Sequence, residues 1–454
     1  MNVIMKFGGT SVADADAMRR VIGIVRHQIE ADPAARPPVV VVSAMSKVTD
    51  RLVEVGRLTG EGAGEQAAGL LTELLQRHLG VAAMLVSGTA LAALSADLER
   101  EFSGLAEMVR ALSGLREVSP RSTDAFLAAG ELASSLIVAA AFSSQGIPAS
   151  WVDARQVLVT DDEHTAAAPD VDATCRRTQE VVGTKLAARQ VPVLGGFVGA
   201  APDGVTTTLG RGGSDYSAAI FGACLDVDEI QIWTDVDGML TADPRVVSDP
   251  KLVPQLSFAE ASELAYFGAK VLHPSTILPA VTKNIPVRIL NSRRPEVTGT
   301  LITANGRVGG PALTALACKR GVTVVDITST RMLMAHGFLR RLFEVFERFK
   351  TPVDVVTTSE VSVSVTVDNP RRLEDVVSHL SHFAEVACEP NMAIVCVVGE
   401  NLRSDPTLFG RAVTSLDQIP LRLVSQAASR RNITFVIRDA DVPEAMNRLH
   451  KALF

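Results

Sequence analysis

The chain of 454 residues is poor in aromatic side chains, which make up 4% of it, and it has no excess of basic residues. Its 44 Lys and Arg residues against 51 Asp and Glu residues give a formal net charge of −7. This balance argues against a nucleic-acid partner, which requires clustered basic surface. No uninterrupted apolar run reaches the roughly 18 residues of a membrane-spanning helix, and the first residues lack the pattern of a secretory signal. We therefore expect a cytoplasmic protein without a membrane partner.

Cysteine is scarce as well. The five cysteines, at positions 175, 224, 318, 388 and 396, are odd in number, and no two of them form a C-x-x-C pair. This usage predicts reduced, buried thiols, with neither a disulfide nor a structural zinc site. The eight histidines form no obvious cluster, and we predict no metal site built from protein side chains.

Short apolar stretches alternate with amphipathic or alanine-rich stretches through the first two thirds of the chain, which is typical of α/β folding. Several of the apolar stretches are β-branched and apolar on both faces, as buried parallel strands are. Helices are predicted over 14–30 and 123–144, and the segment 58–115 is predicted to be helical throughout. The predicted strands are 3–7, 39–43, 149–153, 191–195, 229–234 and 287–291.

The C-terminal third of the chain contains an internal sequence repeat. "TPVDVVTTSEVSVSVTV" at 351–367 resembles "IPLRLVSQAASRRNITFVI" at 419–437, with an offset of 420 − 352 = 68 residues, and a predicted helix precedes each copy (339–349 and 407–415). Two α+β units of this size predict a paired small-molecule sensing module of the ferredoxin-like kind. The predicted boundaries are a first domain over 1–296, a Gly/Pro-rich linker over 297–310, and two repeats over 311–383 and 384–454.

The stretch "KFGGTS" at 6–11 places a lysine at the end of the first predicted strand and two glycines in the next turn. Glycines let backbone N–H groups approach an anion, and a helix N-terminus adds a favourable dipole. Thr10 and Ser11 are predicted to cap the helix that starts at Asp14. By itself this stretch fits a phosphate site and a purely structural turn about equally well.

A second glycine-rich turn, "LGRGGSD" at 209–215, precedes a predicted helix over 217–224. Two such turns, each with a cation (Lys6 and Arg211), suit a polyphosphate and an anionic substrate together. Asp215 lies beside them, where a carboxylate can order Lys6 or help to hold a magnesium shell.

Six motifs, in order along the chain, resemble the aspartate kinase family: KFGGTSV at 6–12, GELASS at 130–135, GRGGSD at 210–215, TDVDG at 234–238, DPR at 243–245 and FGAKVLHP at 267–274. The resemblance covers the chain and includes a C-terminal pair of ACT domains, without a homoserine dehydrogenase half. It implies an amino-acid-kinase fold, a three-layer sandwich around a mostly parallel sheet, followed by two ferredoxin-like α+β ACT domains. The implied reaction is ATP-dependent phosphorylation of the side-chain carboxylate of L-aspartate to 4-phospho-L-aspartate, the first step of lysine, threonine and methionine biosynthesis.

The resemblance also assigns catalytic and substrate-binding roles. Lys6 neutralises the transferring phosphoryl group and Asp215 orients Lys6, while backbone N–H groups of Gly8, Gly9 and Gly213 face the phosphoryl oxygens. Arg211 matches the residue that binds the α-carboxylate, and Glu131 matches the one that receives the α-ammonium. The remaining polar lining corresponds to Ser43, Thr49, Gly213 and Ser214. The attacking carboxylate is already ionised at pH 7, so no general base is required.

The nucleotide contacts implied by the resemblance are Lys6, Gly9, Thr234, Asp235, Leu240, Arg245 and Lys270. Family members often have tyrosine where this chain has Leu240, so an aromatic partner for the base is missing at that position. Mg²⁺ is expected to be held mainly through the nucleotide phosphates.

The C-terminal part resembles the lysine-responsive subgroup, whose ACT domains bind an amino-acid effector and form a homodimer, or a tetramer. The matching effector positions are Met332, Ala335, Gly337, Phe338, Leu339, Asp354, Ser359 and Glu360. Family precedent also indicates that the second ACT domain borrows a strand from 311–318. Asp354 in the first copy aligns with Arg422 in the second, which favours binding of a basic effector, L-lysine, by the first copy.

Two alternatives remain open at the level of sequence. One is another amino-acid-kinase enzyme acting on a different carboxylate or on a carbamate. The other is an amino-acid sensor that kept the fold but lost turnover, against which the presence of Lys6, Glu131, Arg211 and Asp215 argues.

Overall fold

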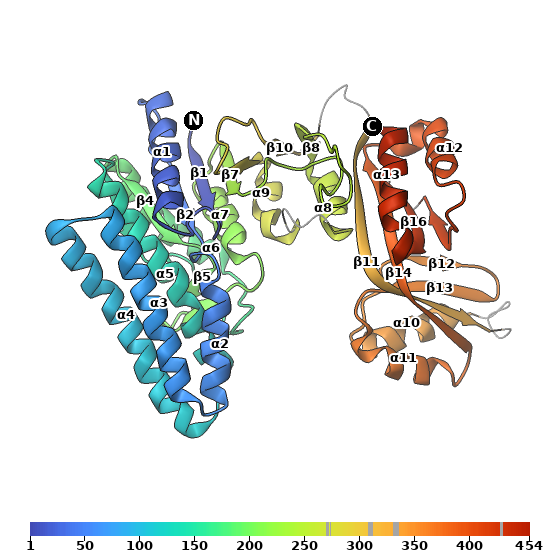
Figure 1. The fold of residues 1–454 in the computed structure, drawn as a ribbon, viewed down its shortest axis with the longest axis horizontal. Coiled ribbons are helices and arrows are strands. Elements are labelled where there is room, and N and C mark those ends of the chain that lie inside the picture. Colours follow the sequence, from blue (N-terminus) through green and yellow to red (C-terminus); the bar gives the residue numbers. More distant parts are fainter. Residues whose placement is uncertain (269–271, 273, 307–311, 330–335, 427–429) are drawn as a thin grey trace. The chain divides into compact units, whose positions relative to one another are not determined.

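The computed structural model describes the chain except residues 269–271, 273, 307–311, 330–335 and 427–429. The chain divides into two compact units (Figure 1). Unit 1 comprises 1–239, 254–258 and 271–307, and unit 2 comprises 240–253, 259–270 and 308–454. Two segments that were predicted within the first domain thus lie with unit 2, where for example the Leu316 N–H donates to the Thr241 carbonyl at 2.7 Å.

An eight-stranded sheet forms the centre of unit 1. Six strands run parallel, β10 is antiparallel to β9, and β8 is parallel to β10. The order across the sheet is β3 (Ala149–Val152), β4 (Val191–Gly195), β2 (Val39–Val42), β1 (Val3–Phe7), β7 (Glu229–Thr234), β9 (Val287–Asn291), β10 (Thr300–Thr303) and β8 (Gln255–Ser257). Every residue of β1, β2 and β4 is buried, as expected for parallel strands covered on both faces. Because β1 pairs in parallel with β2 on one side and β7 on the other, the turn that follows β1 lies at the carboxyl end of the central strands, where open α/β sheets bind their ligands.

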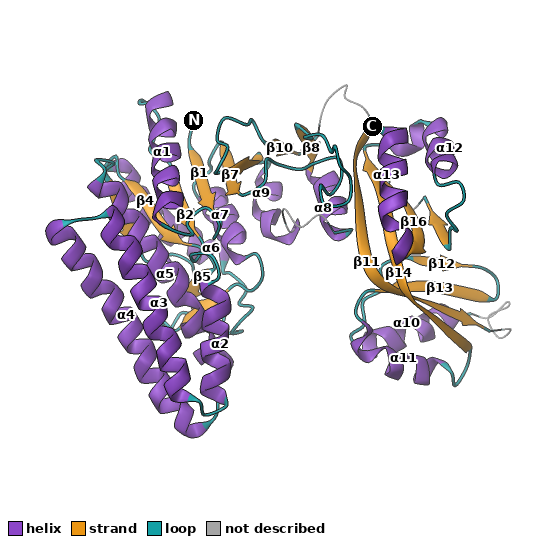
Figure 2. Ribbon diagram, in the orientation of Figure 1, coloured by secondary structure: helices purple, strands orange, loops and turns teal. Residues whose placement is uncertain are grey.

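Helices cover this sheet, and a separate hairpin of β5 (Val198–Ala200) and β6 (Thr206–Thr208) lies beside it. Figure 2 shows α2 to α5 packed together as one helical group. The helices of unit 1 are α1 (Ala15–Ala31), α2 (Val48–Gly60), α3 (Gly64–Leu85), α4 (Gly88–Leu115), α5 (Pro120–Ser144), α6 (Val171–Ala187), α7 (Gly213–Cys224) and α9 (Leu278–Lys283). By length and composition alone α5 could cross a membrane, but 78% of its most apolar stretch is buried inside the protein, as in the core helix of a globular fold.

Two local predictions are wrong. The cap of α1 is Asp14, whose side chain accepts a hydrogen bond from the Ala17 N–H, whereas Ser11 contacts the Trp233 carbonyl and Ser292 instead. The predicted linker 297–310 contains β10, which pairs with β9 through Thr300 to Ile302 and with β8 on its other side. The strand was missed because it has only four residues and the segment around it is polar.

The prediction that no disulfide forms is also wrong. Cys175 of α6 and Cys224 of α7 are bonded. The two helices pack side by side and bring the Cα atoms within 4.6 Å, although 49 residues separate the cysteines in sequence. Neither the odd total nor the missing C-x-x-C motif carries information about a pair made by helix packing. Cys318, Cys388 and Cys396 are free thiols.

Unit 2 is built on a six-stranded antiparallel sheet. Its order is β12 (Val356–Thr358), β13 (Ser362–Val367), β11 (Leu313–Thr328), β14 (Glu385–Gly399), β16 (Asn432–Arg438) and β15 (Leu423–Ser425). Its helices are α8 (Phe258–Tyr266), which begins at the last residue of a unit 1 segment, α10 (Phe338–Arg348), α11 (Leu373–Leu380), α12 (Pro406–Ser415) and α13 (Val442–Leu453).

The two long central strands of this sheet belong to two α+β halves at once. The C-terminal half of β11 pairs with β13, and the C-terminal half of β14 pairs with β16. Between them, 313–320 of β11 pairs with 393–399 of β14, while 324–328 pairs with 385–389. One apolar core lies under α10 and α11, and a second lies under α12 and α13. The N-terminal part of β11, residues 313–320, therefore belongs to the second repeat in space, although it precedes the first repeat in sequence.

Candidate active site and effector site

Lys6 and Asp215 form the charged centre of unit 1. Lys6 lies on β1 and Asp215 in the first turn of α7, and Lys6 Nζ is 2.6 Å from Asp215 Oδ1. Only 11% of the lysine side chain and 16% of the aspartate side chain are exposed. The pair is thus an ammonium fixed by a carboxylate at the carboxyl end of the central strand β1, next to both glycine-rich turns.

The two glycine-rich turns leave fewer free N–H groups than predicted. The Gly8 N–H donates to the Trp233 carbonyl at 3.0 Å and the Gly213 N–H to the Gly210 carbonyl at 3.1 Å, so these two are not available as anion donors. Their turns need these bonds to hold their shape. In the described part of the chain, the N–H groups of Gly9, Ser214 and Asp215 have no acceptor. Two of these belong to the first turn of α7, where the helix dipole favours an anion.

Close packing against the next turn requires glycine at position 9. A Cβ atom added there would lie 2.9 Å from the Ala44 carbonyl oxygen, and the Gly9 carbonyl accepts a hydrogen bond from the Ser46 N–H at 3.1 Å. The turn after β1 therefore packs directly on the turn after β2. This contact connects Lys6 to the segment that contains Ser43 and Thr49, both of which are half-buried.

Glu131 is a buried carboxylate on α5 with an incomplete set of partners. The residue is 4% exposed, and its buried Oε2 has no hydrogen-bond partner in the described part of the chain. Burial raises the pKa of Glu131 to about 8, although hydrogen bonds from backbone N–H groups, including that of Ala44, and the positive charge of Lys6 act in the opposite direction. A buried carboxylate of this kind lacks a cation.

Sequence reasoning missed Asp124, which lies on α5 seven residues, or two turns, before Glu131. Its fully buried carboxylate accepts hydrogen bonds from His164 Nδ1 at 2.7 Å and from Thr208 Oγ1 at 2.6 Å, and from the Thr165 N–H. Thr208 ends β6, three residues before Arg211. Asp124 thus fixes the strand that leads into the Arg211 turn to the helix that carries Glu131. The spacing of the two acids on one helix face is the signal that could have found it.

Comparison with known proteins decides the family. Residues 1–291 match the amino acid kinase family, and residues 395–453 match an ACT domain. The chain is 36% identical to chloroplastic aspartokinase 3 of Arabidopsis thaliana over 100% of the chain and 82% of that protein. The crystal structure of E. coli aspartokinase III in complex with aspartate and ADP is 34% identical, covers 100% of both chains and superposes with a TM-score of 0.84. The same enzyme in complex with lysine and aspartate is also 34% identical, covers 100% of this chain and 99% of that one, and gives 0.81.

The chain belongs to the aspartokinase family. The predicted family, the amino-acid-kinase fold with C-terminal ACT domains and the assignment as a kinase are thereby confirmed. This aspartokinase carries the predicted substrate residues in unit 1: Arg211 is exposed, and Ser214 follows Gly213 in the first turn of α7.

The residues predicted to contact the nucleotide fall into both units of the aspartokinase. Thr234 and Asp235 follow β7 in unit 1, and Thr234 Oγ1 donates to Asp235 Oδ1 at 3.3 Å. Leu240 and Arg245 belong to unit 2, where Arg245 pairs with Asp243 at 2.6 Å and is 78% exposed. Lys270 lies outside the described residues.

Among the predicted effector residues of unit 2, Asp354 has the most distinctive surroundings. Its side chain is 4% exposed, and Oδ1 accepts hydrogen bonds from Lys319 Nζ and from the Tyr266 hydroxyl, both at 2.8 Å. Lys319 also pairs with Asp368 at 3.1 Å. Burial lowers the pKa of Lys319, but the two carboxylates outweigh it, and the net direction is upward. Asp354 therefore already faces an ammonium group of its own chain.

The other predicted effector residues lie around the start of α10 and the β12–β13 turn. Gly337 precedes α10 with a φ of +83°, a left-handed conformation that glycine adopts without strain. Phe338 is buried, whereas Leu339, Ser359 and Glu360 are exposed. Met332 and Ala335 lie outside the described residues.

Proposed function

We propose that unit 1 of this aspartokinase transfers the γ-phosphoryl group of ATP to the side-chain carboxylate of L-aspartate, giving 4-phospho-L-aspartate. The observation that carries the proposal is Glu131, a buried carboxylate with an unpartnered oxygen in the unit that also holds the Lys6–Asp215 pair. An α-ammonium group is the cation that such a carboxylate lacks. An amino acid bound there offers its side-chain carboxylate as a nucleophile that is already ionised.

In this proposal each side chain has one task. Lys6 lowers the repulsion between the carboxylate and the phosphoryl group, and Asp215 holds the lysine in place. The N–H groups of Gly9, Ser214 and Asp215 face the phosphoryl oxygens, and Arg211 binds the α-carboxylate in a bidentate manner. The polar lining is completed by Ser43, Thr49 and Ser214, and Asp124 is a positioning residue for Glu131 and Arg211.

For ATP we propose contacts with Thr234, Asp235, Leu240, Arg245 and Lys270. No group of three or more Asp, Glu, His or Cys side chains in the described residues could hold a metal ion. We propose that Mg²⁺ is bound mainly through the nucleotide phosphates, whose charge it would partly neutralise during transfer.

Trapping with hydroxylamine tests the reaction directly. Acyl phosphates react with hydroxylamine to give a hydroxamate, so L-aspartate with Mg-ATP should yield coloured hydroxamate in proportion to enzyme. N-carbamoyl compounds and L-glutamate should yield little. A stronger signal from another carboxylate would favour a different amino-acid-kinase activity, and no signal above a Lys6→Ala control would favour a sensor without turnover.

We further propose that L-lysine is the effector and that its ammonium group binds Asp354. A solved aspartokinase relative binds lysine and aspartate in one complex, which supports lysine as the ligand class. Since Lys319 Nζ contacts Asp354 Oδ1 in this structure, an effector ammonium has to compete with Lys319 or use Oδ2, which is buried and has no partner in the described part of the chain. Lys319 then sets how much lysine is needed for inhibition.

Replacing Lys319 by methionine is expected to lower the half-inhibitory lysine concentration about tenfold, because a free carboxylate remains to be paired and one charge-assisted hydrogen bond is worth about 1.5 kcal/mol. Initial rates with increasing L-lysine measure the effect. Arg320→Met is the matched control, since Arg320 is the next residue on β11 and pairs with Asp439 instead. A Lys319→Met enzyme that needs as much lysine as the wild type, or more, would show that the two ammonium groups do not compete.

We also propose a homodimer formed through the ACT domains, or a tetramer, located in the cytoplasm. The sheet edges at β12 and β15, each a strand of three residues, are short enough to avoid uncontrolled strand pairing. Light scattering of the purified protein determines the number of subunits.

A further inference from the structure

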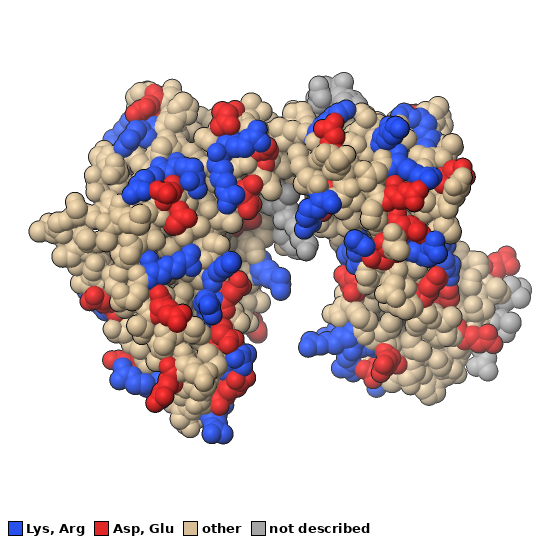
Figure 3. All heavy atoms as spheres, in the orientation of Figure 1, with Lys and Arg blue, Asp and Glu red and all other residues tan. Residues whose placement is uncertain are grey.

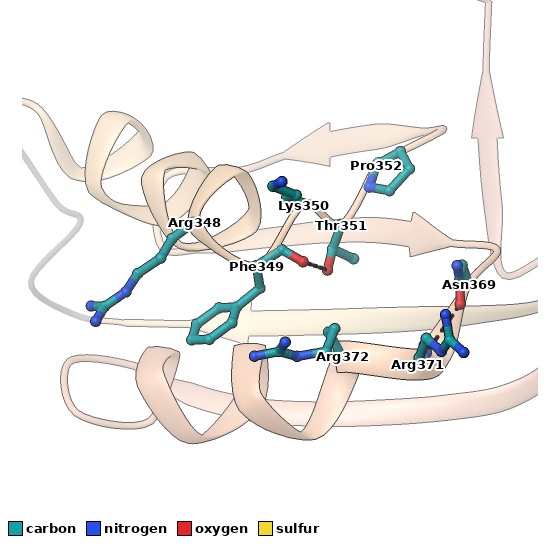
Figure 4. A pocket seen from close by; sticks show the side chains of 8 residues that line it. All are labelled: Arg348, Phe349, Lys350, Thr351, Pro352, Asn369, Arg371 and Arg372. Atoms are coloured by element: carbon teal, nitrogen blue, oxygen red, sulfur yellow. Dashed lines mark hydrogen bonds between the residues drawn. The ribbon is translucent and has the colours of Figure 1, made fainter. Parts of the chain in front are cut away.

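A cavity of about 480 Å³ in unit 2 is surrounded by positive charge. It lies where α10 ends and α11 begins, and it is lined by Arg348, Phe349, Lys350, Thr351, Pro352, Asn369, Arg371 and Arg372. In Figure 4 the segment with Lys350 and Pro352 lies on one side of the space, and Asn369, Arg371 and Arg372 lie on the other. These residues differ from the predicted effector residues and from the Lys6 site, which is in unit 1.

Few carboxylates balance these four cations. Arg372 pairs with Asp375 at 2.6 Å, whereas no ion pair is found for Arg348, Lys350 or Arg371 in the described part of the chain. The chain as a whole has a net charge of −7, so this concentration of positive charge is not a general property of its surface. In Figure 3, Lys and Arg side chains project beside the region of α10 and α11, with Asp and Glu side chains next to them.

The position of the arginines is unfavourable for the helix that follows. Arg371 and Arg372 lie immediately before α11, at the positive end of its dipole, where an anion is stabilising and a cation is not. Arg348 and Lys350, by contrast, lie at the C-terminus of α10, where cations are favourable. Helix stability thus explains two of the four cations. Arg372 is held by Asp375 and by the ring of Phe349, whereas Arg371 has neither an ion pair nor a ring contact in the described part of the chain.

The ring of Phe349 holds two of the guanidinium groups. Arg372 Cζ lies 5.3 Å and Arg348 Cζ 5.8 Å from the ring centroid, and Figure 4 shows the ring between these two side chains. A stacked guanidinium keeps its N–H groups free at the ring edge, and its orientation is already restricted before a ligand binds. Thr351, which is 7% exposed, donates its hydroxyl to the Phe349 carbonyl at 3.2 Å and so helps to fix the segment that carries the ring.

We propose that this cavity binds a small phosphorylated anion. A phosphate group carries nearly two negative charges on three terminal oxygens, which can be shared by cations that approach from two sides, whereas a carboxylate offers two oxygens and one charge. A cavity of this volume has room for a small phosphorylated metabolite or a nucleotide in addition to the phosphate group. The inference does not rest on the proposed reaction.

Isothermal titration with inorganic pyrophosphate at constant ionic strength tests the inference. The wild-type chain should show a class of sites that the double variant Lys350→Asn, Arg371→Gln binds at least tenfold more weakly. Asparagine is chosen because Lys350 has a φ of +49°, which asparagine tolerates. The matched control is Arg100→Gln, Arg438→Gln, which removes the same charge from two exposed residues outside the cavity and should bind as the wild type does.

Two further arms identify the source of the phosphate. Ribose 5-phosphate, as a phosphorylated metabolite, and AMP, as a nucleotide, are titrated in the same way. The compound whose binding is weakened more by the double variant identifies the ligand class. Citrate serves as a carboxylate anion, and citrate binding as tight as that of pyrophosphate would overturn the phosphate assignment. Equal pyrophosphate binding by the wild type and the double variant would overturn the site itself. If the double variant unfolds early in a thermal scan, Arg371→Gln alone carries the test. Among the described residues, Arg371 makes one hydrogen bond, from its backbone N–H to the Asn369 side chain, and the substitution keeps it.

Discussion

Replacement of Lys6 by alanine is expected to lower kcat by about 1000-fold or more. In the wild type, the ammonium group of Lys6 is fixed 2.6 Å from Asp215 and is largely shielded from water. Fixed positive groups that face a transferring phosphoryl group typically contribute factors of this size. Without Lys6, the negative charge of Asp215 also faces the phosphoryl group uncompensated, so the loss exceeds that of one neutral donor.

Initial rates with saturating L-aspartate and Mg-ATP measure this loss. Lys283→Ala is the matched control, because Lys283 forms an exposed ion pair with Asp226 in the same unit, at 3.0 Å, and its loss should leave kcat unchanged. Thermal unfolding of both variants separates a folding defect from a catalytic one. In the double variant Lys6→Ala, Asp215→Ala both charges are removed. We expect this variant to regain any thermal stability that Lys6→Ala alone loses, and its activity to stay low. A Lys6→Ala enzyme within tenfold of the wild type would remove Lys6 from the proposed mechanism.

Replacement of Glu131 by glutamine is expected to raise KM for L-aspartate about 100-fold with a much smaller effect on KM for ATP. The amide keeps the shape of the side chain but cannot pair with an ammonium group, and a charged hydrogen bond at a buried site is worth a few kcal/mol. Since the pKa of Glu131 is about 8 in the ligand-free protein, roughly one molecule in ten has the ionised form at pH 7. The wild-type KM for L-aspartate should therefore fall several-fold between pH 7 and pH 9.

The same substitution should stabilise the ligand-free protein above pH 8. The pKa of Glu131 is higher in the folded state than the ordinary value of 4.5, so the folded state retains a proton that the unfolded state has lost. Stability therefore falls as the pH rises from about 4.5 to 8, and the penalty is complete above pH 8. It amounts to a few kcal/mol, since each pKa unit corresponds to about 1.4 kcal/mol. Glutamine avoids the penalty, so Glu131→Gln should melt higher than the wild type at pH 8.5 and alike at pH 4.

Glu107→Gln, an exposed residue of α4, is the control for both measurements. If the Glu131→Gln enzyme kept the wild-type KM for L-aspartate, the ammonium site would have to lie elsewhere. If its melting temperature at pH 8.5 were not raised, Glu131 would not be a strained buried carboxylate.

Sequence reasoning predicted the frame of unit 1 well, because buried parallel strands have a strong signature. The predicted bounds of β1, β4, β7 and β9 agree with the structure to the residue. The catalytic pair was found through motifs, since Lys6 and Asp215 are 209 positions apart and only the fold brings them together. That burial leaves Glu131 with a pKa near 8 could not be read from its neighbours in sequence, because the burial comes from the packing of α5.

Three of the failures have a common physical cause. The Cys175–Cys224 bond, the hydrogen bonds of Asp124 and the use of the Gly8 N–H by Trp233 all depend on contacts between elements that are distant in sequence. Local patterns report which residues are buried in a helix or strand, but they do not report which atoms meet across elements. The cap of α1 failed for a local reason, because several residues in a row were able to serve as caps.

The shared strands β11 and β14 also determine where this chain can be cut. A boundary after residue 383, which divides the repeats in sequence, does not divide them in space, because 313–320 pairs with the C-terminal half of β14. A shortened gene product ending there would expose eight residues of unpaired strand, together with Ala242, Val247 and Leu316, which now lie in the core under α12 and α13. We therefore expect that loss of a single repeat from this chain would give an aggregating protein rather than a simpler sensor.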